Sequence, residues 1–190
     1  VLDAALAALE AELAEEGQVA RLPGGDALAH TLVTPRPIPA EIDKIRYNLC
    51  SVDFDPATGT IGSRIDTLIF AEAMGKSVSF PKPSYDGRFL VYTLSDYGNF
   101  SIWHHEADLW ILDLATGESR PMDKANSKDT ESYHSWSSNS RWLMFSSRRD
   151  DGLYTRLFFT HIDENGQESK PFMLPQKHPL HYYSYLNRSY

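Results

Sequence analysis

The chain has 190 residues, a hydrophobic fraction of 42% and a formal net charge of −8 at pH 7. Its length permits one good core or two small ones, and no apolar run approaches the roughly 20 residues of a membrane helix. Acidic and basic residues are interspersed, which argues against a nucleic-acid partner because duplex binding needs a basic stripe. The single cysteine, Cys50, excludes an internal disulfide and a cysteine-rich zinc site.

Residues 1–40 differ in composition from the rest, with many alanines before position 40 and few after it. Four leucines recur at helical spacing: Leu2, Leu6, Leu9 and Leu13. This stripe predicts an amphipathic helix over residues 1–16. Three prolines then alternate with other residues: Pro35, Pro37 and Pro39. Because alternating prolines favour an extended linker, we expect 1–40 to be a separate helical segment with a proline-rich linker, either native or foreign to the rest.

From about Arg46 the chain becomes rich in aromatic and β-branched residues, which are typical of strands. Hydrophobic runs at 49–55 and 65–70 predict two strands, with a turn after the first. A repeated unit of four strands follows later in the chain. The second half of that unit has the same order as this region: a hydrophobic run, an Asp, small residues, a Gly and a second hydrophobic run. Residues 46–76 are therefore predicted to form part of such a unit.

The complete unit occurs twice. Arg88 and Arg141 lie 53 positions apart, an offset that aligns Phe89 with Trp142. Each copy predicts four short strands, at 78–84, 89–94, 107–114 and 118–122 in the first, and at 133–137, 142–147, 154–163 and 168–174 in the second. Internal repetition at this period indicates stacked modules.

The second strand of each copy, at 89–94 and 142–147, has apolar or aromatic residues at consecutive positions. A strand of that kind is covered on both faces, whereas a β-sandwich would show polar residues at alternate positions. A four-stranded antiparallel sheet that is covered on both faces and repeats about every 50 residues is a propeller blade. We therefore predict an all-β fold of β-propeller blades with an N-terminal α-helical appendage.

The first copy reads SYDGRFLVYT at 84–93 and ADLWILDLATGE at 107–118. This motif resembles the TolB-type, WD40-like β-propeller repeat, as found in envelope proteins of Bacteroides-type bacteria. The resemblance is strong over 77–175, weak over 46–76, and does not reach 1–40. The second copy has Ser-Ser-Asn-Ser at 137–140 in place of the family's Ser-Pro-Asp-Gly turn, so a wider turn is expected there.

The predicted organisation is a partial blade at 46–76, complete blades at 77–132 and 133–175, and an aromatic tail at 176–190. A propeller closes with four to eight blades, and an open set would leave exposed faces and unpaired edges. We therefore expect either a partial propeller cut from a larger protein or a ring that another chain completes, and favour the first.

An up-and-down topology places the loops between second and third strands, together with the loops between blades, on one face. Loops on a rigid scaffold are where binding residues concentrate, and aromatic residues beside Arg are typical of interaction hot spots. Six residues of these loops are candidates for binding a protein or peptide: Tyr97, Trp103, His104, His105, Arg148 and Arg149.

The sequence supports a metal site or a catalytic site less well than it supports a binding surface. His104, His105 and Glu106 are metal-capable, but adjacent residues of an extended chain point apart, so no metal site is predicted. His134 is expected to be a buried hydrogen-bonding residue. No catalytic motif is present, and nothing selects a pair among the loop carboxylates, which are Asp96, Glu106 and Glu131. No cofactor is predicted.

The family resemblance implies a non-catalytic binding or scaffold module, periplasmic or associated with the outer membrane. Propellers of this type also cap serine peptidases of the prolyl-oligopeptidase kind, where the propeller gates substrate and another domain carries out catalysis. That role is the alternative. No signal peptide opens the chain, so the compartment rests on the resemblance alone.

Overall fold

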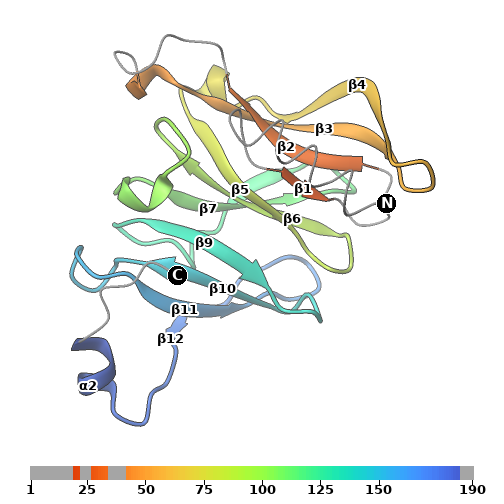
Figure 1. The fold of residues 1–190 in the computed structure, drawn as a ribbon. Helices are drawn as coiled ribbons and strands as arrows, with labels where there is room; N and C mark the ends of the chain where they lie inside the picture. Colours follow the sequence, from red (N-terminus) through yellow and green to blue (C-terminus); the bar gives the residue numbers. More distant parts are fainter. Residues whose placement is uncertain (1–18, 22–26, 34–41, 185–190) are drawn as a thin grey trace.

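The computed structural model describes residues 19–21, 27–33 and 42–184, which fold into three four-stranded antiparallel sheets (Figure 1). In each sheet the strands pair with their neighbours in chain order. Hydrophobic clusters join the first sheet to the second and the second to the third. The fold is therefore all-β with the architecture of stacked propeller blades; we name the sheets blades one, two and three.

Blade one consists of β1 (Val19–Arg21), β2 (Ala27–Val33), β3 (Tyr47–Asp55) and β4 (Thr60–Ile69). The strands β3 and β4 are its third and fourth, as the sequence predicted. The boundary predicted at residue 40 is wrong, because β2 pairs with β3 from Ala27↔Asp53 to Val33↔Tyr47. Pairing with β3 satisfies an edge that half a blade would leave open, which overrides the low strand propensity of alanine. The helix predicted over 1–16 lies outside the described residues.

Blade two consists of β5 (Ser77–Pro83), β6 (Phe89–Ser95), β7 (Asp108–Asp113) and β8 (Ser119–Pro121). Blade three consists of β9 (Glu131–Trp136), β10 (Trp142–Ser147), β11 (Arg156–His161) and β12 (Phe172–Met173). All eight strands occur where the repeat predicted them. The remaining elements are short helices: η1 (Ile42–Lys44), η2 (Ala71–Met74), η3 (Ser101–Trp103) and α2 (Pro179–Ser184).

Strand β6 is buried along its whole length. Leu90 and Tyr92 belong to the cluster shared with blade one, and Phe89 and Val91 belong to the cluster shared with blade three. Successive side chains of a strand point to opposite faces, so a blade with neighbours on both sides needs an apolar residue at every position.

Strand β10 differs from the prediction. Leu143 and Phe145 are fully buried against blade two, but Trp142 is 39% exposed and Met144 is half-buried. Burial of β10 on both faces was therefore the wrong expectation. The reason is that no described segment forms a sheet on the far side of blade three.

The first strands of blades two and three contain equivalent irregularities. Phe80 and Tyr133 lie 53 positions apart, and both have positive φ, at 54° and 47°. The register between the first and second strands shifts within both blades. A β-bulge re-aims a side chain, and these two rings meet with centroids 4.6 Å apart.

Two side chains of β9 bind the main chain of blade two. His134 Nε2–H donates to the Val91 carbonyl at 2.9 Å, and Trp136 Nε1–H donates to the Lys82 carbonyl at the same distance. His134 is fully buried, as predicted, and burial lowers its pKa to about 4. The imidazole is therefore neutral in the folded protein at neutral pH.

We expect Tyr92→Ala to lower the free energy of unfolding by about 3–5 kcal/mol, as is typical for truncating a buried aromatic residue. Tyr92 is 1% exposed, and its hydroxyl hydrogen-bonds Ser119 Oγ at 2.8 Å. Trp142→Ala should cost less, because this ring is already partly in water. Urea denaturation of the two variants measures the difference, and an equal or greater loss for Trp142→Ala would contradict the burial described above.

His134 should make stability depend on pH between about 6.5 and 4. An unfolded histidine has a pKa of about 6.5, so below that pH the unfolded state binds a proton that the folded state, with its lowered pKa, does not. Stability should fall with decreasing pH by about 1.4 kcal/mol per unit until the folded pKa is reached. Denaturation of the parent and His134→Gln across this range tests it. The His134 contribution is the difference between the two curves, and parallel curves would refute it.

Candidate functional site

Three loops meet at the left-hand side of Figure 1: residues 96–107, 122–130 and 148–155. We call this side the loop face. A buried hydrogen bond joins Ser101 Oγ in the first loop to Ser132 Oγ of β9 at 2.6 Å, and Thr130 Oγ1 donates to the Ser101 carbonyl at 3.0 Å. These bonds hold the blade-two loop against blade three and fix the positions of the exposed side chains around it.

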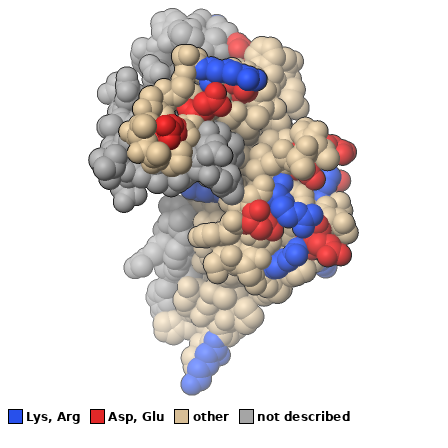
Figure 2. All heavy atoms as spheres, turned by 90° about the vertical axis from the view of Figure 1, so that its right-hand side faces the viewer, with Lys and Arg blue, Asp and Glu red and all other residues tan. Residues whose placement is uncertain are grey.

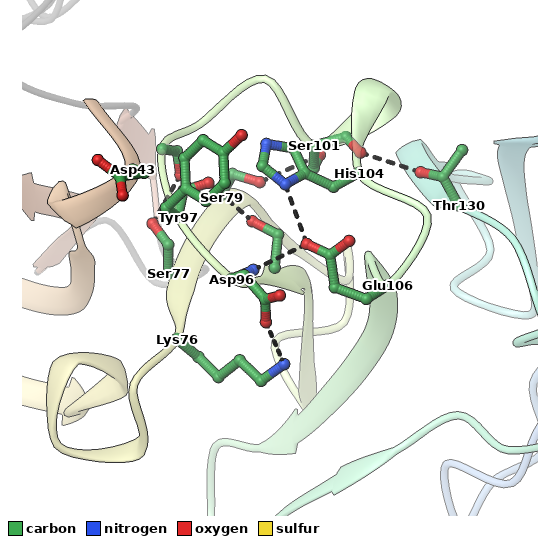
Figure 3. Close-up of polar contacts among 12 residues, drawn as sticks. Asp43, Lys76, Ser77, Ser79, Asp96, Tyr97, Ser101, His104, Glu106 and Thr130 are labelled. Atoms are coloured by element: carbon green, nitrogen blue, oxygen red, sulfur yellow. Dashed lines mark hydrogen bonds and ion pairs between the residues drawn. The ribbon is translucent and has the colours of Figure 1, made fainter. Parts of the chain in front are cut away.

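Tyr97, His104 and Glu106 form one cluster of the loop face (Figure 3). The Tyr97 and His104 rings meet edge to face with centroids 4.4 Å apart, and His104 Nδ1 lies 2.9 Å from Glu106 Oε1. The same carboxylate oxygen accepts the Asp96 amide N–H at 3.1 Å, while Lys76 Nζ lies 2.6 Å from Asp96 Oδ1. The His104 side chain is only 10% exposed, so it supports the loop rather than projecting from it.

His105 lies in a turn, in which the Ala107 backbone N–H donates to the His104 carbonyl at 3.1 Å, and its side chain leaves that cluster. Its side chain is 73% exposed, and its Nδ1 lies 3.0 Å from Asp129 Oδ1 in the next loop. In the described ranges no group of three His, Cys, Asp or Glu side chains is placed to hold a metal ion. The two neighbouring histidines therefore serve separate contacts.

Trp103 and Arg148 form the second part of the site, in which the Trp103 ring is exposed and Arg148 is half-buried, with its Nε enclosed. The Arg148 guanidinium carbon lies 4.4 Å from the centroid of the Trp103 ring, a cation–π geometry. Trp103 is 71% exposed. No ion pair of Arg148 occurs among the residues that the structure describes.

Arg149 has a different environment from Arg148. Its side chain is 16% exposed, and Nη2 lies 3.0 Å from Glu131 Oε1 and donates to the Ala125 carbonyl. The guanidinium also stacks over two core rings, Phe145 and Phe158. Arg149 therefore lies inside the protein, although the sequence grouped it with the exposed candidates.

Glu131 is completely buried, and burial raises the pKa of its carboxyl group. Hydrogen bonds from Ser127 and Ser147 and the charge of Arg149 oppose that shift. Of the three loop carboxylates considered for catalysis, this one is enclosed in a structural network. The other two, Asp96 and Glu106, belong to the Tyr97 cluster.

Three other residues of the same loops are exposed and were not predicted from the sequence. Phe100 is 67% exposed, Leu153 is 72% exposed and Tyr154 is 40% exposed. Phe100 directly precedes η3, which also contains Trp103. The only feature of the sequence that could have indicated their exposure is the presence of an apolar residue within a polar loop. Together with Trp103 these residues give the loop face an apolar character.

The opposite side has a different surface. Figure 2 views the molecule from the side of the tight turns, which we call the turn face, and shows acidic and basic side chains interspersed on it. There Arg88 of blade two donates to the Glu164 carbonyl of blade three. A cavity of about 160 Å³ lies nearby and is lined by residues that include Phe89, Arg120 and Gly166.

No family model and no curated protein matches the sequence. Solved β-propeller structures do resemble the fold. TolB from Acinetobacter baumannii is 13% identical with a TM-score of 0.51, over 83% of this chain and 32% of that one. Prolyl oligopeptidase B from Galerina marginata is 12% identical with a TM-score of 0.50, over 83% of this chain and 22% of that one.

The propeller domain of the Trilobed protease from Pyrococcus furiosus is 17% identical with a TM-score of 0.45, over 85% of this chain and 44% of that domain. The chain thus spans less than half the length of each of the three. The fold is that of a partial β-propeller. The fold of TolB is similar to it. No helix in the described part of the chain is long and apolar enough to cross a membrane.

The two adjacent arginines should respond differently to truncation. We expect Arg149→Ala to lower the free energy of unfolding by about 3–5 kcal/mol, because it leaves the Glu131 charge buried without its partner. Arg148→Ala should cost less than about 1 kcal/mol, because its guanidinium pairs only with an exposed ring. Thermal and urea denaturation of both variants measure this, and similar losses would contradict the assignment of one arginine to the interior.

Proposed function

We propose that this chain is a non-catalytic β-propeller module that binds a protein or peptide through its loop face. The observation that carries the proposal is the exposure of Trp103, Phe100 and Leu153, each more than two-thirds accessible, on the loops that also bring Arg148 over the Trp103 ring. Aromatic residues and arginine dominate binding energy at protein interfaces, and an apolar surface rimmed by polar groups is typical of interaction sites. On the turn face, by contrast, acidic and basic side chains are interspersed (Figure 2).

Within the site, Trp103 and Arg148 would contact the partner directly. His105 lies at the edge of the same surface. Tyr97 and His104 would act by positioning the loop through their ring contact and the bond to Glu106. Arg149 would contribute only indirectly, through the ion pair that fixes the start of β9.

The resemblance of the repeat to TolB-type proteins supports a bacterial envelope location, either periplasmic or associated with the outer membrane. The alternative function, a propeller that gates substrate for a serine peptidase of the prolyl-oligopeptidase kind, draws on the similarity to prolyl oligopeptidase B. In that case the occupant of the loop face would be a catalytic domain of the same polypeptide or a peptide passing to it.

Site-specific photo-crosslinking separates these cases. A benzoylphenylalanine at Phe100 on the loop face should give a cross-linked adduct in the native envelope fraction. The same probe at Tyr85 is a matched control, because Tyr85 is an aromatic residue of the turn face that is 68% exposed. Trp103→Ala with Arg148→Ala should reduce the Phe100 adduct at least about tenfold, because losing roughly 1.4 kcal/mol of binding energy already costs a factor of ten.

Mass spectrometry of the adduct then identifies its origin. A separate protein or peptide supports the binding module, and a hydrolase domain of the same polypeptide supports the gating role. Adducts formed only from position 85 would reverse the assignment of faces. Peptide hydrolysis by this chain that a single substitution at Glu106 or His104 abolishes would overturn the non-catalytic proposal.

A further inference from the structure

The fourth strand of blade one forms a long open edge. Strand β4 has 10 residues and is the last strand of its sheet, so within the described residues it pairs with β3 alone. Figure 1 shows it along the outer side of the molecule, at the top right, with no labelled strand beyond it. An edge strand presents a row of backbone N–H and C=O groups with which a further strand can pair.

Blades two and three end differently at the equivalent edge. Their fourth strands, β8 and β12, have only 3 and 2 residues. Pro121 ends β8, and Pro171 and Pro175 lie on either side of β12. Short strands and prolines are common means of preventing pairing at a sheet edge. Strand β4 has neither, although two register shifts against β3 leave residues 65–67 as its regular middle part.

The side chains of this middle part are exposed, and two of them are charged. Every residue of 63–67 is exposed, and Ile65 is 54% exposed. Arg64 and Asp66 lie on either side of Ile65 and pair with each other, with Nη2 3.0 Å from Oδ1 and side chains that are 74% and 49% exposed. Because so exposed an ion pair adds little stability to the fold, both charges can also pair with a second molecule.

The order of residues around Ile65 is self-complementary. When two copies of β4 run antiparallel with Ile65 opposite Ile65, Arg64 of each copy lies opposite Asp66 of the other. Ser63 then lies opposite Thr67. Opposite charges and β-branched residues form favourable cross-strand pairs, whereas like charges directly opposite are destabilising. A register shifted by two residues in either direction loses the match, because Arg64 or Asp66 then lies opposite itself.

We propose that β4 is a homodimerisation edge, at which a second copy of this chain adds antiparallel and joins the two blade-one sheets into one continuous sheet. A second copy is the occupant because its Arg64 and Asp66 complete a group of four charges that alternate in sign around the two-fold axis. The surface is the outer edge of a blade and not a face on which blades stack. The proposal does not depend on the binding function of the loop face.

The contact is small compared with a standard interface, so the dimer should be weak, with a Kd of about 10–100 µM. Sedimentation velocity of the 190-residue chain between about 1 and 500 µM should therefore show reversible dimerisation.

Charge exchange between two variants tests the pairing. Arg64→Asp places acidic residues opposite each other across the dimer, and Asp66→Arg places basic residues opposite each other. Each variant alone should therefore dimerise at least about tenfold more weakly than the parent. An equimolar mixture restores both opposite-charge pairs in the heterodimer, so it should regain the affinity of the parent, and native mass spectrometry should show one copy of each variant in the dimer.

The matched controls are Lys170→Asp and Glu118→Arg, which make the same changes of charge at exposed positions of blades three and two. Both should dimerise like the parent. All four side chains are exposed, so circular dichroism should show every variant folded. A parent chain that stays monomeric over the whole range would overturn the proposal. So would a mixture that dimerises no better than its components, or a dimer that Arg64→Asp does not weaken.

A cysteine at the two-fold axis tests the register independently. In a Cys50→Ser background, which removes the only natural thiol, Ile65→Cys should form a disulfide-linked dimer under mild oxidation, because residues directly opposite come close enough for the bond. Ser63→Cys alone should cross-link at least about tenfold more slowly, since it lies opposite Thr67. Ser63→Cys mixed with Thr67→Cys should give the mixed disulfide. Equal rates for Ile65→Cys and Ser63→Cys would refute the antiparallel register.

Discussion

The contact of one sheet face with the next determines most of this structure. A four-stranded sheet of short strands has little interior of its own, so its apolar surface must be buried against a neighbour. In blade two this happens twice, and β6 has no exposed residue. The hydrogen bonds from His134 and Trp136 fix the register of that contact, because each binds one particular carbonyl of blade two. Apolar packing supplies the stability, and these two donors fix the position of one blade on the next.

The same packing separates the two ends of the blades. Because the strands of each blade pair antiparallel in chain order, the turns between first and second strands and between third and fourth strands lie on one side. The loops between second and third strands lie on the other side. On the turn face the hairpins are short, and Asp86 and Asp113 accept backbone N–H groups in adjacent turns. On the loop face the chain is longer and carries aromatic residues that the strands do not need. Trp103 and Arg148 come from different blades and still meet, because the blades beneath them are fixed.

Much of this could be predicted from the sequence, because a repeat with apolar runs at equivalent positions specifies blades and their strand order. Strands β1 and β2 were not predicted. They lie in a region whose alanines do not favour strands, and their strand structure comes from pairing of β1 with β2 and of β2 with β3. The binding role of the candidate site stays a prediction, and only the positions of its residues can be compared with the structure. Loop composition identified Trp103 and Arg148 but could not separate Arg148 from Arg149, although neighbouring residues at the end of a strand point to opposite sides. Ser147 and Arg149 share the inward side, whereas the Arg148 guanidinium lies over the exposed Trp103 ring.

The buried pair of Glu131 and Arg149 shows how the loop face depends on polar rather than apolar contacts. Arg149 reaches the Ala125 carbonyl in the linker between blades, the carboxylate at the start of β9, and the rings of β10 and β11. An apolar residue could fill the space above these rings but could not bind the linker and the carboxylate together. Buried ion pairs add little net stability and are better explained by the arrangement that they specify. In this protein, that arrangement joins the linker to the blade that follows it. The part of the molecule proposed to bind a partner is therefore also a part whose geometry depends on polar contacts.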